Sequence, residues 1–186
     1  NFNLKTNLDL GDANNDFHNL GLANEVFTIE SGRRVHSNNG KGLEMGSLST
    51  ASSNSTNKYI NEGEVSITGG DDTSRALSIS YGTIHNKNLI SVDKGIGAYG
   101  INGSKLINDQ NANINITGEG VGMAAFTSGT SLQDYGTDKN ISAGTLGTAK
   151  TLEILNKGTI TVNGDTSVGI YGKTDKITGA HASTNV

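Results

Sequence analysis

A nine-residue phrase recurs along the chain at intervals of roughly 24 residues, starting at Asn61, Asn86, Gln110 and Asn156. Its copies read NEGEVSITG, NKNLISVDK, QNANINITG and NKGTITVNG. The first residue is polar, the third is mostly turn-forming, and the fifth and seventh are apolar, so each copy describes one turn that leads into one strand. An internal period of this size predicts a solenoid of stacked repeats, in which function is to be sought where the repeat is broken.

Each phrase is followed by a second strand-like segment and then by a short third apolar stretch. In the second segments small residues alternate with apolar ones: GKGLEM from Gly40, SRALSI from Ser74, GIGAYG from Gly95, GVGMAA from Gly120 and SVGIYG from Ser167. Three strands per unit predict an all-β, three-sided coil, a parallel β-helix of about five rungs. We expect a first, degenerate unit near Ala23, with Phe27 and Ile29 as its two inward residues. Residues 1–22 are expected to form a partial rung and a loop.

The start of each phrase predicts a corner of the coil. Identical amides stacked about 4.8 Å apart can form a hydrogen-bonded ladder. The candidates are Asn61, Asn86 and Asn156, with Gln110 as a substitute. Gly158 and Asn88 occupy the third position of their phrases, where we expect a positive φ.

The composition agrees with a thin, β-rich core and excludes several classes of function. Of the 186 residues, 33% are apolar and only 5% aromatic, with 26 Gly and no Pro to interrupt a strand ladder. The chain contains no Cys, so disulfides and thiolate metal sites are excluded. A net charge of −4 without a Lys/Arg cluster argues against nucleic acid as a partner. No apolar run approaches the roughly 18 residues of a membrane span, and the start at Asn1 without a signal sequence leads us to expect a segment of a longer protein.

GIGAYG, residues 95–100, matches the GxGxxG fingerprint of dinucleotide sites, and Glu119 lies about twenty residues further on. A true fingerprint must open a helix, whereas the downstream INGSKLINDQNANINI is too rich in Asn and Gly for one. The same shape recurs at Gly120 and Ser167, so we assign it to the repeat and expect no cofactor there. The histidines lie at unrelated repeat positions and are interpreted as isolated surface residues: His18, His36, His85 and His181.

Acidic residues recur at the corner between the first and second strands of the unit: Asp71, Asp72, Asp93, Glu119 and Asp165. Stacked rungs would place them in a column, with carboxylates roughly 5 to 10 Å apart, a range that includes the acid pairs of glycosidases. The same column could ligate calcium, the one metal that we consider. The simplest interpretation is that these residues supply turn chemistry, with Lys94 and Arg75 screening their repulsion.

Two insertions, residues 48–58 and 127–150, interrupt the repeat. Both follow a second strand and precede a third, so we expect them to leave the same corner three rungs apart, about 14 Å along the axis. Insertions on one face of a solenoid often form its binding surface. The longer one carries a polar and aromatic set suited to a sugar or a protein: Asp134, Tyr135, Asp138 and Lys139.

The pattern NxGx(I/V)x(I/V) combined with SVGIYG, in a chain rich in Gly, Asn and Thr, resembles the passenger domains of large type V autotransporter adhesins, especially fusobacterial ones. The resemblance covers about residues 23–172 and is closest over residues 156–172. It implies a right-handed parallel β-helix that is displayed on the bacterial surface, anchored to the outer membrane through regions absent here, and that adheres to host cells or other bacteria. The matching positions are structural, so no binding residue is transferred.

We therefore expect residues 1–186 to form one β-helix segment of a surface adhesin that is not an enzyme and needs no cofactor. A rigid stalk would present the two insertions to a host-cell protein, a glycan or another bacterium. The alternative is a β-helix polysaccharide lyase or glycosidase that uses the stacked carboxylates. A phage fibre, which would be an obligate trimer, is a third interpretation.

Overall fold

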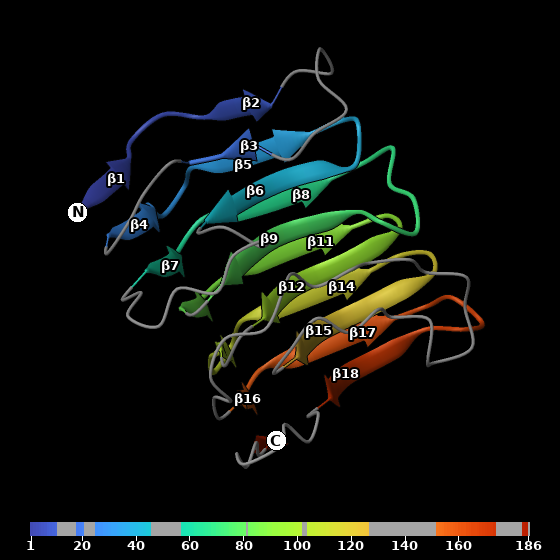
Figure 1. Cartoon of the computed structure of the whole chain (residues 1–186). Helices are drawn as coiled ribbons and strands as arrows, with labels where there is room; N and C mark the ends of the chain where they lie inside the picture. Colours follow the sequence, from blue (N-terminus) through green and yellow to red (C-terminus); the bar gives the residue numbers. More distant parts are fainter. Residues whose placement is uncertain are drawn as a thin grey trace.

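The computed structural model describes residues 1–10, 18–20, 25–45, 57–80, 82–101, 104–126, 152–173 and 184–185. In these ranges the chain coils repeatedly through three parallel sheets (Figure 1). Sheet A is β1 (Phe2–Leu4), β4 (Val26–Ile29), β7 (Lys58–Asn61), β10 (Thr83–Asn86), β13 (Lys105–Asn108), β16 (Leu152–Asn156) and β19 (Thr184–Asn185). Sheet B is β2 (Leu8–Leu10), β5 (Arg34–Ser37), β8 (Glu64–Ile67), β11 (Leu89–Val92), β14 (Asn113–Ile116) and β17 (Thr159–Val162). Sheet C is β3 (His18–Asn19), β6 (Lys41–Met45), β9 (Arg75–Ser80), β12 (Gly95–Ile101), β15 (Gly120–Phe126) and β18 (Val168–Lys173).

Each rung contributes one strand to each sheet, which confirms the three-sided parallel β-helix. Rung 1 holds β1 to β3, rung 2 holds β4 to β6, and so on to rung 6 with β16 to β18, while β19 pairs with β16. Rungs 2 to 6 are the five rungs expected, and residues 1–22, which were expected to form a partial rung and a loop, contribute the three short strands of rung 1. Phe2 pairs with Phe27 and Leu8 with Val35, so these strands stack in register on rung 2.

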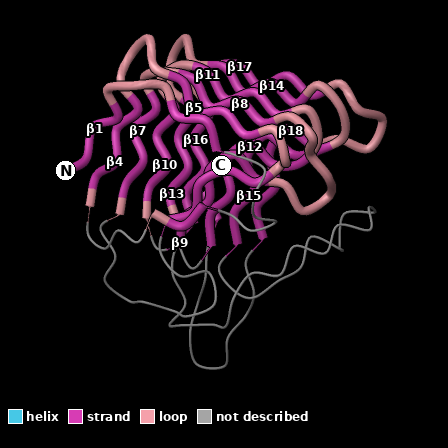
Figure 2. Tube along the Cα trace, turned by 90° about the horizontal axis from the view of Figure 1, so that it is seen from above, coloured by secondary structure: helices cyan, strands magenta, loops and turns pink. Residues whose placement is uncertain are grey.

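The core lies between the three sheets, whose strands Figure 2 shows from above. Along β10 and β11 buried and half-buried residues alternate, and Ile84, Ile90 and Val92 have no exposed surface. Each such side chain contributes roughly 1.5–3 kcal/mol of transfer free energy. Because each inward side chain stacks on its equivalents in the rungs above and below, β-branched residues suit both the strand and the column of side chains.

The rung near Ala23 differs from its expected alignment. Phe27 and Ile29 do point inward, at 2% and 0% exposure, but they belong to β4 of sheet A. The strand of rung 2 that corresponds to the repeated phrase is β5, with Val35 in the inward position. In this degenerate unit the expected alignment was therefore displaced by one strand, from sheet B to sheet A.

A buried amide ladder runs along the corner where sheet A ends. The Nδ2 group of Asn61 donates to Oδ1 of Asn86 (2.8 Å), Asn86 to Asn108 (2.8 Å) and Asn108 to Asn156 (2.9 Å). The remaining amide hydrogens of Asn61 and Asn86 reach the backbone carbonyls of Leu89 and Asn113 in the next rung. The ladder is confirmed, but its third member is Asn108 and not Gln110.

The misplacement of Gln110 has a simple cause. Two residues join the strands of sheets A and B in rungs 3, 4 and 6, but four do so in rungs 2 and 5, at residues 30–33 and 109–112. The longer corners are turns closed by Arg33 N–H to Glu30 O and by Ala112 N–H to Asp109 O, each 3.0 Å. Gln110 lies in the second of these turns, two residues beyond the ladder.

The corner glycines serve a purpose other than the expected one. Positive φ angles occur at Gly32 (74°) and Asn111 (68°), inside the four-residue turns, and not at Gly158 or Asn88. A Cβ on Gly158 would lie 2.3 Å from the carbonyl oxygen of Ala112 and 2.5 Å from that of Asp109. Glycine is therefore needed at the corner of the rung that follows a long turn, because the carbonyl oxygens of that turn leave no room for a Cβ there.

The ladder predicts a large and selective effect of Asn86→Ala on stability. The substitution removes a donor from the buried Oδ1 of Asn108 and from the carbonyl of Asn113, so we expect a loss of about 3 kcal/mol in the free energy of unfolding. Chemical denaturation measures this loss. Asn115→Ala, on the half-buried outward face of β14, is the matched control, with a change within about 0.5 kcal/mol. Equal effects of the two substitutions would contradict the ladder.

The corner geometry predicts that Gly158→Ala destabilises the chain by about 2 kcal/mol, because the new methyl group would overlap backbone oxygens that cannot move independently. Gly169→Ala is the control, since the nearest atom to its Cβ is Ile160 Cγ2 at 4.0 Å. Thermal unfolding of both variants tests the difference. If Gly158→Ala is as well tolerated as Gly169→Ala, close approach does not explain the corner glycine.

Candidate functional site

The predicted acidic residues do share one corner, between sheets B and C. Asp71 and Asp72 lie between β8 and β9, Asp93 follows β11, Glu119 precedes β15, and Asp165 precedes β18. The rungs stack there through the backbone, as in the bonds from Gly118 N–H to Asp93 O (2.7 Å) and from Gly95 N–H to Glu119 O (3.0 Å).

Two of these carboxylates are engaged in holding their turns. Asp71 Oδ1 accepts hydrogen bonds from the backbone N–H and the hydroxyl of Thr73, both at 2.7 Å, and from the Ser74 hydroxyl at 3.3 Å. Asp93 Oδ1 accepts from the N–H groups of Lys94 (2.7 Å) and Gly70 (3.0 Å), and the second bond joins adjacent rungs. These contacts are the turn chemistry that the sequence suggested.

The expected screening charges behave differently from each other. Lys94 Nζ forms an ion pair with Asp72 Oδ1 at 3.2 Å, and the hydrogen bond and charge of Asp72 raise the pKa of Lys94. Arg75 does not screen the corner. It lies on the outer face of sheet C, where it pairs with Glu44 at 3.5 Å and sits 5.0 Å over the ring of Tyr99.

No three His, Asp or Glu side chains of the described residues gather closely enough to hold a metal ion. The acidic corner therefore presents separate carboxylates in successive rungs. Calcium binding at Asp71, Asp72, Asp93, Glu119 and Asp165 stays a prediction that a calcium titration would test.

The strands that flank the two insertions place both at one corner. Residues 46–57 join β6 of sheet C to β7 of sheet A, and residues 127–151 join β15 of sheet C to β16 of sheet A. Strands β6 and β15 lie three rungs apart in sheet C. Lys58, the last residue of the first predicted insertion, belongs to β7. The predicted contact residues Asp134, Tyr135, Asp138 and Lys139 lie outside the described residues.

A second apolar cluster, which the sequence analysis missed, lies on the outer face of sheet C. Its aromatic members form a row in which the ring centroids of Tyr99 and Phe126 are 5.8 Å apart and those of Phe126 and Tyr171 are 5.7 Å apart. Burial raises the pKa of Tyr99, against the opposing charge of Arg75. Residues 127–151 follow directly after Phe126, so this insertion starts from a firmly packed strand end. The cluster comprises Ile96, Tyr99, Ile101, Val121, Ala124 and Phe126.

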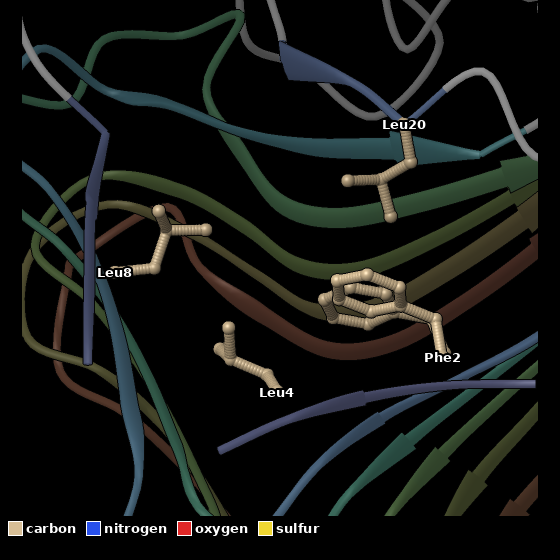
Figure 3. Close-up of a pocket in the computed structure, with 5 residues that line it drawn as sticks. Phe2, Leu4, Leu8 and Leu20 are labelled. Carbon is tan, nitrogen blue, oxygen red and sulfur yellow. The ribbon is translucent and has the colours of Figure 1, made fainter. Parts of the chain in front are cut away.

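The open end of the core at rung 1 forms an apolar pocket of about 230 Å³ (Figure 3). Phe2, 50% exposed, stacks on Phe27 with ring centroids 5.2 Å apart. All lining side chains are apolar, so they offer no group that could orient a polar ligand or transfer a proton: Phe2, Leu4, Leu8, Leu20 and Phe27.

A smaller groove of about 160 Å³ lies at the corner between sheets A and B and has a polar lining. Its charged residues are Arg33, Arg34 and Glu64, and its remaining lining residues are Gly32, Gly63 and Asn88. The sequence offered one signal for it, the adjacent arginines of SGRR directly before β5.

Comparisons of the chain with family models, with curated proteins and with solved structures found no match. Among the described residues there is no helix long and apolar enough to cross a membrane.

The hydrogen bonds of Asp71 predict a defined pH dependence. Although partial burial acts to raise the pKa of Asp71, the bonds from Thr73 and Ser74 and the charge of Lys41 lower it below its ordinary value of 3.8. A lowered folded-state pKa stabilises the fold above 3.8, and this contribution is lost as the pH falls through the folded-state pKa. Asp71→Asn should therefore lower the Tm at neutral pH, with a difference from the parent that shrinks as the pH falls below that value.

Thermal unfolding across a pH series measures this difference. Asp165→Asn is the control, because the exposed Asp165 accepts no hydrogen bond from the described residues. A Tm deficit of Asp71→Asn that stays constant from neutral to strongly acidic pH would show that the carboxylate has no part in the acid sensitivity.

Proposed function

We propose that this chain is a rigid, non-enzymatic display segment of a bacterial surface adhesin, whose insertions bind the partner. The observation that carries the proposal is the common exit of the two insertions. Both interrupt the connection from sheet C to sheet A, and the strands before them lie three rungs apart in one sheet. Two extra segments that leave one edge of a rod can engage one partner together.

The geometry of the acidic corner favours this proposal over a lyase or glycosidase. Oδ1 of Asp71 and Oδ1 of Asp93 each accept several hydrogen bonds at this corner, which fixes the orientation of both carboxyl groups against the backbone. A general acid or base needs a carboxyl group that is free to approach the substrate. Asp93→Asn with Glu119→Gln should leave polysaccharide turnover unchanged, and loss of a measured turnover would favour the enzyme.

The location and the partner follow from the resemblance to autotransporter passenger domains and are part of the proposal. The segment would lie outside the cell, attached to the outer membrane through other regions of its chain. Its partner would be a host-cell protein, a glycan or another bacterium.

The register provides a clean way to remove the long insertion. Ile101 pairs with Phe126 and Lys105 with Glu153, so Ser104 occupies the level of Leu152. In the native chain the dipeptide Asn102-Gly103 makes the equivalent connection, from Ile101 of rung 4 to Ser104 of rung 5. Replacing residues 127–151 by the same dipeptide, Asn-Gly, should therefore preserve the stacking of rungs 5 and 6. The matched control replaces residues 47–56 by a single Tyr, the residue that separates Ser80 from Gly82.

We expect the parent chain, labelled with a fluorophore, to bind saturably to cells that carry the partner. The Asn-Gly variant should bind these cells at least about tenfold more weakly, as the loss of a small hot spot of binding energy requires. The control replacement tells whether the shorter insertion contributes. Circular dichroism and the Tm report on folding. A folded Asn-Gly variant that binds cells as well as the parent would refute the role of residues 127–151.

A further inference from the structure

The corner between sheets A and B has an uneven profile that forms a saddle. Hydrogen bonds set Arg33, Gly63, Asn88 and Ala112 at the same position in successive rungs: Glu64 N–H to Arg33 O (2.9 Å), Leu89 N–H to Gly63 O (3.3 Å) and Asn113 N–H to Asn88 O (2.7 Å). In this alignment the extra residues of rung 2 are Ser31 and Gly32, and those of rung 5 are Gln110 and Asn111. All four are exposed. Rungs 3 and 4 have no counterparts to them.

The two long turns therefore form walls, and the short corners of rungs 3 and 4 form the floor between them. The walls lie three rungs apart, about 14 Å at the usual strand spacing. The groove of about 160 Å³ lies against the first wall, over Gly63 and Asn88. Figure 2 shows loops that rise to unequal heights at the end of sheet A near β5, β8 and β11.

The charged side chains around the groove take no part in the ion pairs among the described residues. Arg33 and Arg34 are exposed, and neither forms an ion pair with another described residue. Glu64 pairs with Arg34 in the strand register, yet no ion pair joins their side chains. By contrast, Glu62 and Lys87 on the same floor are joined at 3.1 Å. Two guanidinium groups and one carboxylate are thus available to a ligand.

The far side of the saddle is also polar and is held in place. His85 Nε2 lies 2.8 Å from Asp109 Oδ2, which corrects the interpretation of His85 as an isolated residue. Asp109 Oδ1 accepts the N–H of Gln110 at 2.9 Å, and together these bonds lower the pKa of Asp109. They fix the base of the second turn, whose tip presents the amides of Gln110 and Asn111.

We propose that this saddle binds an acidic oligosaccharide along the helix axis, with its carboxylate or sulfate groups on Arg33 and Arg34. The planar guanidinium matches both anions in bidentate fashion. The carboxylate of Glu64 accepts hydrogen bonds from sugar hydroxyls. Asn88 accepts them through Oδ1, because its Nδ2 group already donates to Gly63 O at 2.7 Å. The groove has no aromatic or aliphatic lining residue in which a peptide side chain could anchor, which favours a glycan over a protein.

The net charge of −4 makes the proposal specific. A chain of this charge repels polyanions as a whole, so an acidic glycan that binds it must find a local arrangement of cations. The site is distinct from the insertions, which leave the corner between sheets C and A. It extends the proposed function by assigning a ligand class to a second surface of the rod.

The test is a titration of the full chain, ¹⁵N-labelled, with a heparin hexasaccharide, followed by NMR chemical shifts. We expect saturable shifts that cluster at residues 30–34, 63–64, 87–88 and 109–112. Arg33→Gln with Arg34→Gln should weaken binding at least about tenfold, as the loss of charge-assisted bonds requires. The control, Lys58→Gln with Lys105→Gln, removes the same charge from sheet A and should leave the affinity within about twofold.

Three further probes complete the experiment. A galacturonate hexamer tells whether carboxylates suffice or sulfates are needed, and binding of either acidic glycan supports the proposal. Equal binding of maltohexaose, which is neutral, or of hexaglutamate, which carries charge without sugar, would overturn it. The absence of saturable shifts with both acidic glycans at millimolar concentration, or an unchanged affinity of the folded arginine variant, would also overturn it. Repeating the titration on the Asn-Gly replacement of residues 127–151 separates this site from the insertion, because glycan binding should survive there.

Discussion

The buried asparagine ladder is the constraint on which the rest of the structure depends. Each amide must donate to the amide of the next rung and to a backbone carbonyl, so a shift of register by one residue would leave several buried polar groups unsatisfied. The ladder has a start: Ile29 and Leu4 occupy its column in rungs 2 and 1, and Oδ1 of Asn61 has no hydrogen-bond partner among the described residues. In those first rungs apolar side chains fill the column that the amides occupy in the later ones.

Because the strands are committed to stacking, variation is confined to the corners, and each corner varies in its own way. The corner from sheet A to sheet B lengthens by two residues in rungs 2 and 5. The corner from sheet B to sheet C carries acidic turns, and the corner from sheet C to sheet A carries both insertions. The long turns and the insertions occur in the same two rungs, so rungs 2 and 5 depart from the repeat at two edges of the rod. The surfaces proposed for binding lie at these departures.

Much of this organisation could be predicted from the sequence because strand periodicity and corner residues act locally. Ile160 and Val162 alternate with polar residues, and the ladder positions Asn61, Asn86 and Asn156 share one place in the phrase. Gln110 was misassigned because it lies three residues before its strand, as Asn61 does. The ladder amide, Asn108, lies two residues earlier, because this corner has two extra residues. The role of Gly158 could not be inferred, since it depends on carbonyls of the preceding rung and not on its own φ. The saddle and the ion pair of Arg75 with Glu44 were missed for the same reason: both arise between rungs.

The most direct test of the central claim is the hydrogen exchange of asparagine side-chain amides, followed by NMR on the ¹⁵N-labelled chain. We expect the Nδ2 protons of Asn61, Asn86 and Asn108 to exchange far more slowly than those of the exposed Asn113 and Asn163, because each ladder amide is buried and donates to the next rung. Exchange of the ladder amides as fast as that of the exposed amides would contradict a buried ladder, and with it the register on which the corners, the insertions and the saddle are placed.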